Sequence, residues 1–434
     1  MKYYSTRHMA PNASLQEAVI KGLAPDRGLY MPEKINRLPA EFFNEIGNLS
    51  LTDIAKIVAE KFFGDDMDKE KLNAIVSEAL NFDIPLKKVE EEIYVLELFH
   101  GPTFAFKDVG ARFMSRMLSH FVQEQHHENV KVLVATSGDT GSAVANGFLG
   151  VEGIQVFVLY PSGKVSEIQE AQFTTLGQNI VALEIAGTFD DCQALVKSAF
   201  VDEELNKKMY LTSANSINIA RFLPQSIYYF YAYAQLAKQQ LEDNVVVAVP
   251  SGNLGNLAAG LFAKKMGLPI KRFIAANNRN DVFFQYLSTG NYEPRTSIQT
   301  IANAMDVGAP SNFERILDLY NQSHEAIKQD ISGNTYSDAE IKNTIRTVYE
   351  KTGYLLDPHG ACAYQALKDG KKPDETGVFL ATAHPAKFKE TVEKCIGSAI
   401  EIPDRLSAFM RRKKQSHLLS NDFNLFKKTL FNVS

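Results

Sequence analysis

The chain has 434 residues, of which 45% are hydrophobic and 22% charged, a composition typical of a globular protein with room for two or three domains. Its formal net charge of −5 arises from acids and bases mixed along the chain, which argues against a nucleic-acid surface or a basic membrane face. An anionic ligand would therefore have to be held by a local arrangement of donors.

The first part of the chain predicts helices joined by loops. Its start, from Met1 to His8, has no apolar core of signal-peptide length, and no later window has the apolar length of a membrane helix. Helical apolar spacing runs from Ala13 to Gly22 and from Leu51 to Phe63. We expect a mainly helical N-terminal region without obvious chemistry, in a soluble cytoplasmic protein that has no membrane partner.

The segment from Gly101 to Gly110 places Lys107 among small and apolar residues. A lysine removed from water loses its proton more easily and becomes an amine nucleophile. That is the requirement for a Schiff base with pyridoxal phosphate (PLP). The alternative is a surface lysine whose stem packs on Phe104 and Phe106, and the segment by itself leaves both interpretations open.

From Ile93 onward, short apolar runs alternate with small-residue loops and helical stretches. This alternation predicts an α/β fold with mostly parallel, buried strands. The runs expected to form strands are 130–135, 156–160, 180–183, 245–249 and 377–381.

Two of these runs are followed by loops of the same plan, Ser137-Gly138-Asp139-Thr140-Gly141 and Ser251-Gly252-Asn253-Leu254-Gly255. Their glycines let the backbone approach a ligand, and the free N–H groups at a following helix start attract an anion. Neither loop is a GxxxxGK[ST] or a GxGxxG motif. One such loop alone is typical of a tight strand-to-helix turn. Both loops together with Lys107 indicate anion sites for a cofactor and an amino-acid substrate.

Two polar runs receive no chemical role. His126-His127 lies in a polar stretch typical of a solvated helix end or loop, and we assign no metal site. The basic run 411–414 has no aromatic residues between its charges, which favours a solvated face over a nucleic-acid site.

Several segments spread over nearly the whole chain resemble those of one family. They are Ala18 to Leu23, Gly28 to Pro32, Leu96 to Thr103, Phe106 to Asp108, Ala135 to Gly141, Ser213 to Asn218, Pro250 to Asn253 and Thr382 to Phe388. As a set they resemble the longer branch of the threonine synthases, in the fold type II group of PLP enzymes. That group also includes serine/threonine dehydratases, the tryptophan synthase β chain and cysteine synthase.

The resemblance implies an α/β fold of type II, like the tryptophan synthase β chain. It has two subdomains based on parallel sheets and a mainly helical N-terminal domain. We place the N-terminal domain at residues 1–85. Residues 86–226 are expected to form a smaller subdomain with the Schiff-base lysine and the carboxylate loop. Residues 227–434 are expected to form a larger one with the PLP phosphate loop and C-terminal helices.

For the cofactor, the resemblance implies that Lys107 forms the Schiff base and that backbone N–H groups of one loop bind the PLP phosphate. The residues of that loop are Gly252, Asn253, Leu254, Gly255 and Asn256. The family commonly has Phe and Asp at positions 254 and 256. Backbone capture does not depend on those side chains, and Asn256 removes one negative charge near a phosphate.

Two further residues are implied at the cofactor ring. Thr382, at the end of an apolar run, matches the hydroxyl expected at the pyridine nitrogen, although a strand-end hydroxyl also caps turns. Asp139 is implied near the cofactor's phenolic oxygen, and it is also a possible helix N-cap.

The implied reaction converts O-phospho-L-homoserine and water to L-threonine and phosphate by PLP-dependent β,γ-elimination and replacement, which makes the enzyme a lyase. The loop with Ser137, Gly138, Thr140 and Gly141 is implied to hold the substrate carboxylate. The substrate phosphate carries about −1.5 to −2 charges near neutral pH and calls for cations or several donors. The candidates are Lys164, Ser166, Ser216, Asn218 and Arg221, for which helix capping and surface ion pairing are the alternative roles.

Two other functions stay open. A serine/threonine dehydratase shares Lys107 and both loops but needs no second phosphate site. A non-catalytic PLP-binding paralogue keeps the fold, although Lys107, Asp139 and Thr382 together argue against it.

We expect a small-molecule partner, no nucleic acid, and a monomer or small homo-oligomer. The widely spaced cysteines argue against a disulfide framework and a CxxC site, so we expect reduced thiols at Cys192, Cys362 and Cys395.

Overall fold

The computed structural model of the protein describes residues 1–124 and 130–432. The N-terminal region is mainly helical, as predicted, and also contains a small antiparallel sheet of β1 (Tyr3–Ser5) and β2 (Tyr30–Pro32). Strands of three residues are too short for an alternating pattern to reveal. The helices here are α1 (Leu15–Lys21), α2 (Ala40–Glu45), α3 (Leu51–Phe63) and α4 (Lys69–Ala79), with a 3-10 turn η1 (Ile46–Asn48).

Local capping sets the ends of the two helices that the apolar spacing predicts. The Ser14 hydroxyl accepts the N–H of Glu17 at the start of α1, and Gly22 ends that helix at a φ of 70°. Ser50 and Asp53 form a capping box at the start of α3. Both helical predictions are confirmed, and α1 is shorter than the apolar spacing because its caps lie inside that stretch.

A six-stranded sheet forms the larger body of the molecule, with the strand order β11-β10-β9-β12-β4-β3. All neighbouring strands are parallel except β3 and β4. The strands are β3 (Leu86–Glu90), β4 (Ile93–Glu97), β9 (Val246–Pro250), β10 (Arg272–Asn277), β11 (Ile331–Thr335) and β12 (Gly377–Ala381).

Helices cover both faces of this sheet because its buried strands are apolar on both sides. Val247 and Val249 of β9 lie in the core with α5 (Lys107–Glu124), α11 (Ser226–Ala237) and α12 (Gly255–Lys265). Val246 and Ala248 point to the opposite face, in the core with α16 (Asp338–Thr352) and α17 (Pro358–Gly370). Successive residues of one strand thus belong to different cores.

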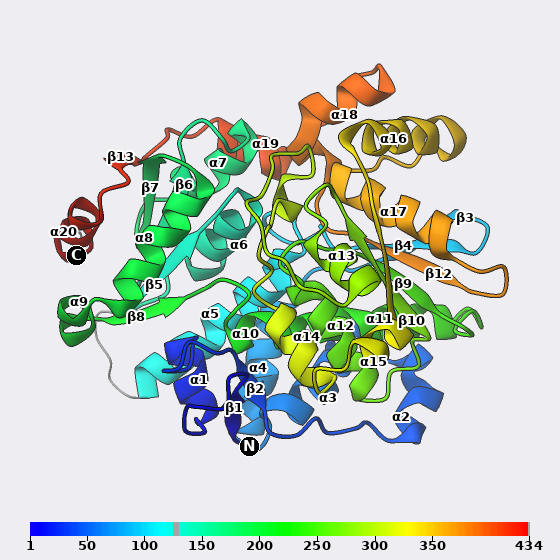
Figure 1. The fold of residues 1–434 in the computed structure, drawn as a ribbon, viewed down its shortest axis with the longest axis horizontal. Coiled ribbons are helices and arrows are strands. Elements are labelled where there is room, and N and C mark those ends of the chain that lie inside the picture. Colours follow the sequence, from blue (N-terminus) through cyan, green and yellow to red (C-terminus); the bar gives the residue numbers. More distant parts are fainter. Residues whose placement is uncertain (125–129, 433–434) are drawn as a thin grey trace.

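A five-stranded parallel sheet forms the second body, with the order β13-β7-β6-β5-β8. Its strands are β5 (Val130–Ala135), β6 (Ile154–Pro161), β7 (Ile180–Ala186), β8 (Tyr210–Ser213) and β13 (His417–Ser420). The helices α6 (Asp139–Phe148), α7 (Glu167–Thr174), α8 (Phe189–Val201) and α20 (Phe423–Asn432) also belong to this body. Figure 1 shows it beside the six-stranded sheet, with the N-terminal helices in blue below both.

Shorter elements complete the fold. They are α9 (Glu203–Lys208), α10 (Ile219–Phe222), α13 (Val282–Thr289), α14 (Phe313–Leu319), α15 (His324–Asp330), α18 (Lys389–Ile396) and α19 (Asp404–Met410), with the 3-10 turns η2 (Leu223–Gln225), η3 (Asn303–Met305) and η4 (Pro385–Phe388).

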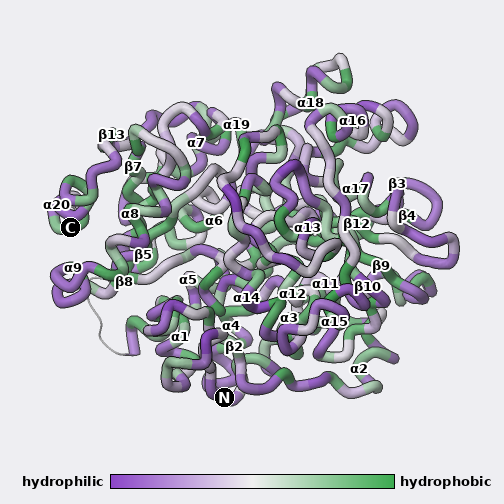
Figure 2. The backbone as a smooth tube through the Cα atoms, in the orientation of Figure 1, coloured by the Kyte–Doolittle hydropathy of each residue, from purple (hydrophilic) through white to green (hydrophobic). Residues whose placement is uncertain are grey.

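The expected fold class is confirmed: two bodies based on parallel sheets and a mainly helical N-terminal region. All five predicted strands are present, as β5, β6, β7, β9 and β12. Figure 2 shows hydrophobic segments along the interior of the fold and hydrophilic ones in outer loops.

The division of the chain into domains at 85/86 and 226/227 stays a prediction. The two sheets group the strands differently from these chain segments. Strands β3 and β4 lie in the middle segment but pair within the six-stranded sheet. Conversely, β13 lies near the end of the chain and pairs with β7. Hydrogen bonding between distant segments decides sheet membership, and position along the chain does not reveal it.

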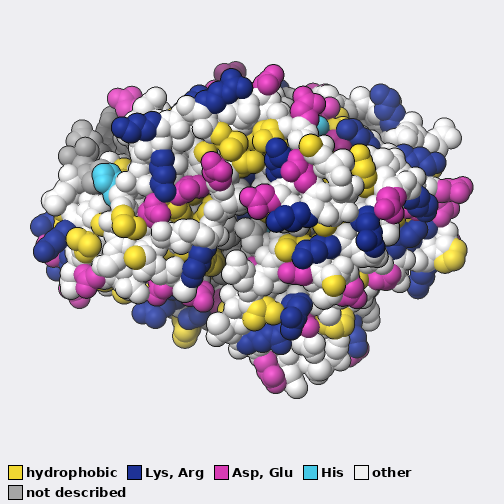
Figure 3. All heavy atoms as spheres, turned by 90° about the horizontal axis from the view of Figure 1, so that it is seen from above, with side chains coloured by type: hydrophobic (Ala, Val, Ile, Leu, Met, Phe, Trp, Pro, Cys, Tyr) yellow, Lys and Arg dark blue, Asp and Glu magenta, His cyan; other side chains and the backbone are white. Residues whose placement is uncertain are grey.

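No helix in the described ranges, 1–124 and 130–432, is both long enough and apolar enough to cross a bilayer. On the face seen in Figure 3, acidic and basic side chains are interspersed.

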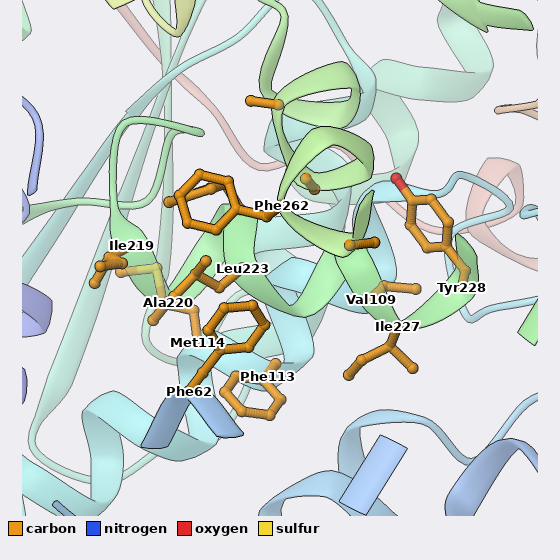
Figure 4. Close-up of a cluster of buried hydrophobic side chains, with 14 of the residues drawn as sticks. Phe62, Val109, Phe113, Met114, Ile219, Ala220, Leu223, Ile227, Tyr228 and Phe262 are labelled. Atoms are coloured by element: carbon orange, nitrogen blue, oxygen red, sulfur yellow. The ribbon is translucent and has the colours of Figure 1, made fainter. Parts of the chain in front are cut away.

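A buried aromatic cluster joins α12 to the N-terminal helices and to α10 (Figure 4). The ring of Phe262 lies 6.3 Å from that of Phe62 and 5.2 Å from that of Phe222, measured between centroids. All of these rings are at least 97% buried. The helix that follows the Gly252 loop is thus anchored in its C-terminal half by an aromatic side chain.

Replacing Phe262 with alanine is expected to lower the free energy of unfolding by about 3 to 5 kcal/mol, because the cavity left behind cannot collapse among packed rings. Urea denaturation followed by circular dichroism measures this. Leu418→Ala, at a side chain that is 69% exposed, is the control. Equal destabilisation by the two substitutions would contradict the anchoring role.

Candidate active site

Two adjoining hollows lie where the loops that follow the parallel strands meet. The inner cavity, of about 120 Å³, is lined by Lys107, Thr382 and the loop from Gly252 to Asn256. The outer cleft, of about 790 Å³, is lined by Lys164, Ser166 and parts of the chain around residues 296–301 and 387–393. Residues that line both hollows include Ser137, so the two adjoin.

Lys107 is the first residue of α5, and its side chain reaches the inner cavity. Its Nζ lies 5.7 Å from the centroid of the Phe106 ring. The dense protein around the amine lowers the pKa of Lys107 to about 8, chiefly by desolvation, and the nearby cations Arg221 and Lys387 lower it further while Asp139 opposes them. Near neutral pH this amine is therefore unprotonated far more often than that of an exposed lysine.

The loop before Lys107 is tied to the end of β12. The N–H of Phe106 donates to the carbonyl oxygen of Thr382 at 2.8 Å, and Ala105 forms an isolated antiparallel bridge with Ala383. Phe104 adopts a left-handed φ of 58°, which costs a non-glycine residue roughly 1–2 kcal/mol. This strained turn brings Lys107 and Thr382 into one cavity although they are far apart in the sequence.

The loop after β9 opens α12, as predicted. A Cβ on Gly252 would lie 2.8 Å from the Ala304 carbonyl oxygen, so this position has no room for a side chain. Leu254 has a left-handed φ of 61° and stands at the N-cap of α12 without a side-chain capping bond. The first N–H groups of the helix thus remain available to an anion.

Unpartnered buried donors at the inner cavity fit an anionic group. The Oδ1 atom of Asn256 accepts hydrogen bonds from the hydroxyls of Tyr228 and Tyr229, while its Nδ2 has no partner among the described residues. Arg221, 2% exposed, likewise has no partner there for Nε and Nη1. Buried donors are normally satisfied, so these atoms and the open helix start suit a phosphate such as that of PLP.

The loop after β5 opens α6, where Gly138 is the N-cap residue with a φ of 140° and Asp139 is the first helical residue. The prediction that Asp139 caps the helix is therefore wrong. Its Oδ1 accepts hydrogen bonds from Gln169 Nε2 at 2.8 Å and makes an ion pair with Lys387 Nζ at 2.7 Å. The N–H groups of Gly138 and Gly141 both donate to Thr136 Oγ1, so these two are engaged within the protein.

Lys387 is a site residue that the sequence interpretation did not assign. It is 1% exposed, and its Nζ also donates to the carbonyl oxygen of Thr103 at 2.9 Å. Burial alone would raise the pKa of Asp139, but Lys387 and Lys107 outweigh it and hold that pKa at about 2. The signal was present in the sequence, since Lys387 lies among apolar residues of η4 much as Lys107 lies in its own segment.

His359 was also missed, and it supports the Gly252 loop through η3. Its Nε2 accepts the N–H of Ala304 at 3.1 Å, so its Nδ1 carries the proton and donates to Asp357 at 2.6 Å. Ala304 in turn packs directly on Gly252. The imidazole therefore fixes a wall of the inner cavity.

The structure separates the candidates for substrate binding. Ser137, Lys164 and Ser166 line the outer cleft, whereas Ser137, Thr140, Ser216 and Arg221 line the inner cavity. Asn218 reaches neither hollow: its Oδ1 caps α10 at the N–H of Ala220, and its Nδ2 donates to the carbonyl oxygen of Val19. Both polar atoms of the Asn218 side chain are thus engaged within the protein, so the structure gives its predicted contact with the substrate no support.

The His126-His127 pair lies outside the described residues. Among residues 1–124 and 130–432, no group of three or more His, Cys, Asp or Glu side chains is arranged to hold a metal ion.

Three family models match the chain. The model described as "Pyridoxal-phosphate dependent enzyme" matches residues 78–382, "Threonine synthase N terminus" matches 2–80, and "Threonine synthase, C-terminal" matches 359–430.

Relatives match over the full length. A threonine synthase of Haemophilus influenzae is 47% identical, with 98% of each chain covered. The crystal structure of threonine synthase from Escherichia coli superposes with a TM-score of 0.94 at 43% identity and full coverage of both chains. A PLP-bound threonine synthase from Brucella melitensis superposes with a TM-score of 0.92 at 36% identity, covering 99% of this chain and 98% of that one.

Gly252→Ala is expected to weaken retention of PLP, because the added methyl group would push the loop away from the Ala304 carbonyl. PLP remaining after dialysis, read from cofactor absorbance, measures this in a chain that has no tryptophan. Leu418→Ala, at a side chain that is 69% exposed, is the control. Equal retention in both variants would count against the loop.

Lys387→Met is expected to shift the pH dependence of PLP capture by the cofactor-free protein. Capture needs the neutral Lys107 amine, so its rate should rise with pH through about 8 in the wild type. Removing the Lys387 cation stabilises protonated Lys107, raises its pKa and moves the midpoint to higher pH. Stopped-flow absorbance measures the rate, and Lys389→Met at the cleft mouth is the matched control. An unchanged midpoint would refute the coupling.

Proposed function

The chain belongs to the threonine synthase family of PLP-dependent enzymes, and we propose that it converts O-phospho-L-homoserine and water to L-threonine and phosphate. The observation that carries the proposal is the pairing of the two hollows. The inner cavity holds Lys107 beside the Gly252 loop, and the outer cleft adds Lys164 and Ser166, which provides room and donors for a second phosphate.

The residues that hold the cofactor in this proposal are Lys107, the backbone of Gly252 to Asn256, and Thr382. PLP withdraws electrons from the substrate's α-carbon, so that protons can leave carbons that are otherwise not acidic. The Thr382 hydroxyl, 6% exposed at the end of β12, is a neutral partner for the pyridine nitrogen. Asp139 contributes through its charge beside Lys107 and not as a lining residue.

Ser137 and Thr140 are the proposed binding residues for the substrate carboxylate. Both line the inner cavity at the start of α6, where the helix dipole favours a negative group. Because the N–H groups of Gly138 and Gly141 donate to Thr136, we assign the contact with the substrate carboxylate to the two hydroxyl residues. This orients the substrate α-carbon toward Lys107.

Lys107 Nζ is the proposed proton carrier. With a pKa of about 8 it is near neutrality, so it can accept the proton from the substrate α-carbon and deliver protons at neighbouring carbons. Such a base works best when its pKa lies close to the working pH.

Lys164 and Ser166 are the proposed anchors of the substrate's phosphate. Lys164 is exposed at the mouth of the outer cleft, and Ser166 caps α7 by accepting the N–H of Gln169. An anchored phosphate leaves in a defined direction while the reacting carbons stay fixed, and water can then add. Ser137 lines both hollows, which supports the proposal that one substrate reaches the carboxylate and phosphate contacts together.

We propose a cytoplasmic enzyme that binds a small-molecule substrate and no nucleic acid, as a monomer or small homo-oligomer. Free thiols at Cys192, Cys362 and Cys395 support a reducing compartment. The interspersed charges on the face seen in Figure 3 lack the basic stripe of a nucleic-acid surface.

Lys164→Ala is expected to lower kcat/KM for O-phosphohomoserine roughly ten- to a hundredfold while leaving the cofactor absorbance intact, because one charge-assisted contact is lost. A coupled assay for released phosphate measures this. Lys197→Ala, on an exposed position of α8, is the control and should keep wild-type kinetics.

Two results would contradict the proposal. Efficient release of ammonia from serine or threonine with no turnover of O-phosphohomoserine would support the dehydratase alternative. Binding of PLP without turnover of either class of substrate would support a non-catalytic paralogue. The joint presence of Lys107, Asp139 and Thr382 argues against that outcome.

A further inference from the structure

We propose that Asn312 is a positioning residue that aims the hydroxyl proton of Ser216 at an anionic oxygen of the substrate. The proposal rests on the proposed function, because it concerns how the inner cavity receives O-phospho-L-homoserine. Ser216 lines that cavity, whereas Asn312 is fully buried and lines neither hollow. Asn312 therefore acts on the substrate only through Ser216.

The orientation of the Asn312 amide is fixed by Arg315, which lies in the first turn of α14 after Asn312. Nη1 of Arg315 donates to Asn312 Oδ1, and a guanidinium has donors only, so the amide oxygen faces it. Arg315 is itself fully buried and donates to the carbonyl oxygens of Ser216 at 2.9 Å and Ile217 at 2.6 Å. The Nδ2 group of Asn312 is consequently the part of the amide that points away from Arg315.

Both protons of this Nδ2 have acceptors. One goes to Ser216 Oγ at 3.0 Å, and the other goes to the carbonyl oxygen of Asn253, in the Gly252 loop, at 3.0 Å. The Ser216 oxygen is thus an acceptor toward Asn312. Its single proton finds no acceptor within residues 1–124 and 130–432. Because the Ser216 side chain lines the inner cavity, that proton is available to a ligand.

The substrate is the ligand that we assign to this proton. Ser216 lies in the same short segment as Arg221, a buried cation that also lines the inner cavity. A hydroxyl donor beside a cation suits the anionic oxygens of a phosphate or a carboxylate. The cofactor's phosphate already has the uncapped N–H groups at the start of α12. A hydroxyl that is oriented before the substrate arrives loses less conformational freedom on binding.

The test compares two substitutions at Asn312 in the PLP-loaded, full-length enzyme. Asn312→Asp keeps the size of the side chain and the oxygen that faces Arg315, whose charge balances the new carboxylate. The second carboxylate oxygen accepts where Nδ2 donated, so it captures the Ser216 proton and turns it away from the substrate. We expect kcat/KM for O-phosphohomoserine to fall roughly ten- to a hundredfold, mainly through KM. Asn312→Ala leaves the hydroxyl undirected but free, so its loss should be smaller, about three- to tenfold.

A purely structural role of Asn312 gives the reverse order, because Asn312→Ala leaves a cavity and Asn312→Asp does not. A double-mutant cycle with Ser216→Ala adds a second criterion. Ser216→Ala alone should also lower kcat/KM roughly ten- to a hundredfold, and Asn312→Asp added to it should change kcat/KM by less than about threefold. Repulsion between the new carboxylate and the substrate would persist without the hydroxyl, so the cycle detects it.

The affinity for the cofactor should not follow these losses. Asn253 keeps hydrogen bonds from the backbone N–H groups of Ser311, at 2.7 Å, and of residue 312, at 3.2 Å, which a substitution of the Asn312 side chain leaves in place. Absorbance titration of the cofactor-free protein should therefore give a Kd of PLP within about threefold of wild type for both Asn312 variants.

Asn179→Asp is the matched control for the exchange of an amide for a carboxylate. The Nδ2 of Asn179 likewise donates to two carbonyl oxygens, those of Phe148 and Ile154, and this residue lines neither hollow. Its substitution should lower the Tm and leave KM for O-phosphohomoserine at the wild-type value.

The product L-threonine, which has a carboxylate but no phosphate, identifies the group that Ser216 binds. If Asn312→Asp raises KM for O-phosphohomoserine and leaves the inhibition constant of L-threonine within about threefold, the acceptor is the substrate's phosphate. If both constants rise by the same factor, the acceptor is the carboxylate.

Three results would overturn the proposal. In the first, Asn312→Ala lowers kcat/KM more than Asn312→Asp does. In the second, the losses of Asn312→Asp and Ser216→Ala multiply in the double variant. In the third, the Kd of PLP rises as far as KM, which would place the Ser216 proton on the cofactor. Absence of O-phosphohomoserine turnover by the wild-type enzyme would instead contradict the proposed function.

Discussion

The buried ion pair between Lys387 and Asp139 joins the two sheet-based bodies at the place where the chemistry is expected. Lys387 comes from the segment after β12, and Asp139 begins the helix after β5. The same ammonium binds the carbonyl of Thr103, in the loop that leads to Lys107. Breaking such a buried pair by removing one partner typically costs about 3–5 kcal/mol. The interaction therefore fixes the relative position of both bodies and of the reactive lysine together.

The charge balance around this pair explains how the site handles anions in a protein whose net charge is −5. Asp139, Arg221 and Lys387 all lie close enough to Lys107 to act on its charge, and α12 begins beside the inner cavity with N–H groups that no side chain caps. Desolvation chiefly, and the cations Arg221 and Lys387 in addition, lower the pKa of Lys107, and the same buried cations suit the anionic groups of the proposed ligands. The same buried cations thus favour a neutral Lys107 amine and the binding of anionic groups.

The backbone of the site carries strain that the rest of the fold supports. Phe104 and Leu254 are both non-glycine residues in the left-handed region, each at the entrance to a helix that lines the inner cavity. A hydrogen bond from Phe106 to the end of β12 holds the first turn, and η3, pinned by His359, packs against the second loop. The packed ring of Phe262 fixes α12 against the rings of Phe62 and Phe222. The fold tolerates this strain because packed elements surround the two strained turns.

The sequence by itself determined the elements and the chemistry that each loop offers. Apolar runs indicated the strands β5, β6, β7, β9 and β12, and the glycine loops after two of them predicted helix starts suited to anions. The setting of Lys107 among apolar residues indicated a depressed pKa. These features are local, since neighbouring residues set strand pattern, backbone freedom and desolvation.

Tertiary structure alone decided which side chains remain free for a ligand. Asn218 and Arg221 lie in one short segment, yet the first caps α10, while Nε and Nη1 of the second are buried without a partner among the described residues. Lys387 and His359 entered the site through contacts with residues far away in the chain. The sheet to which a strand belongs also does not follow from its place in the chain, since β13, near the end of the chain, pairs with β7. Hydrogen bonds and charges between distant segments depend on the assembled geometry, and no local pattern of residues encodes them.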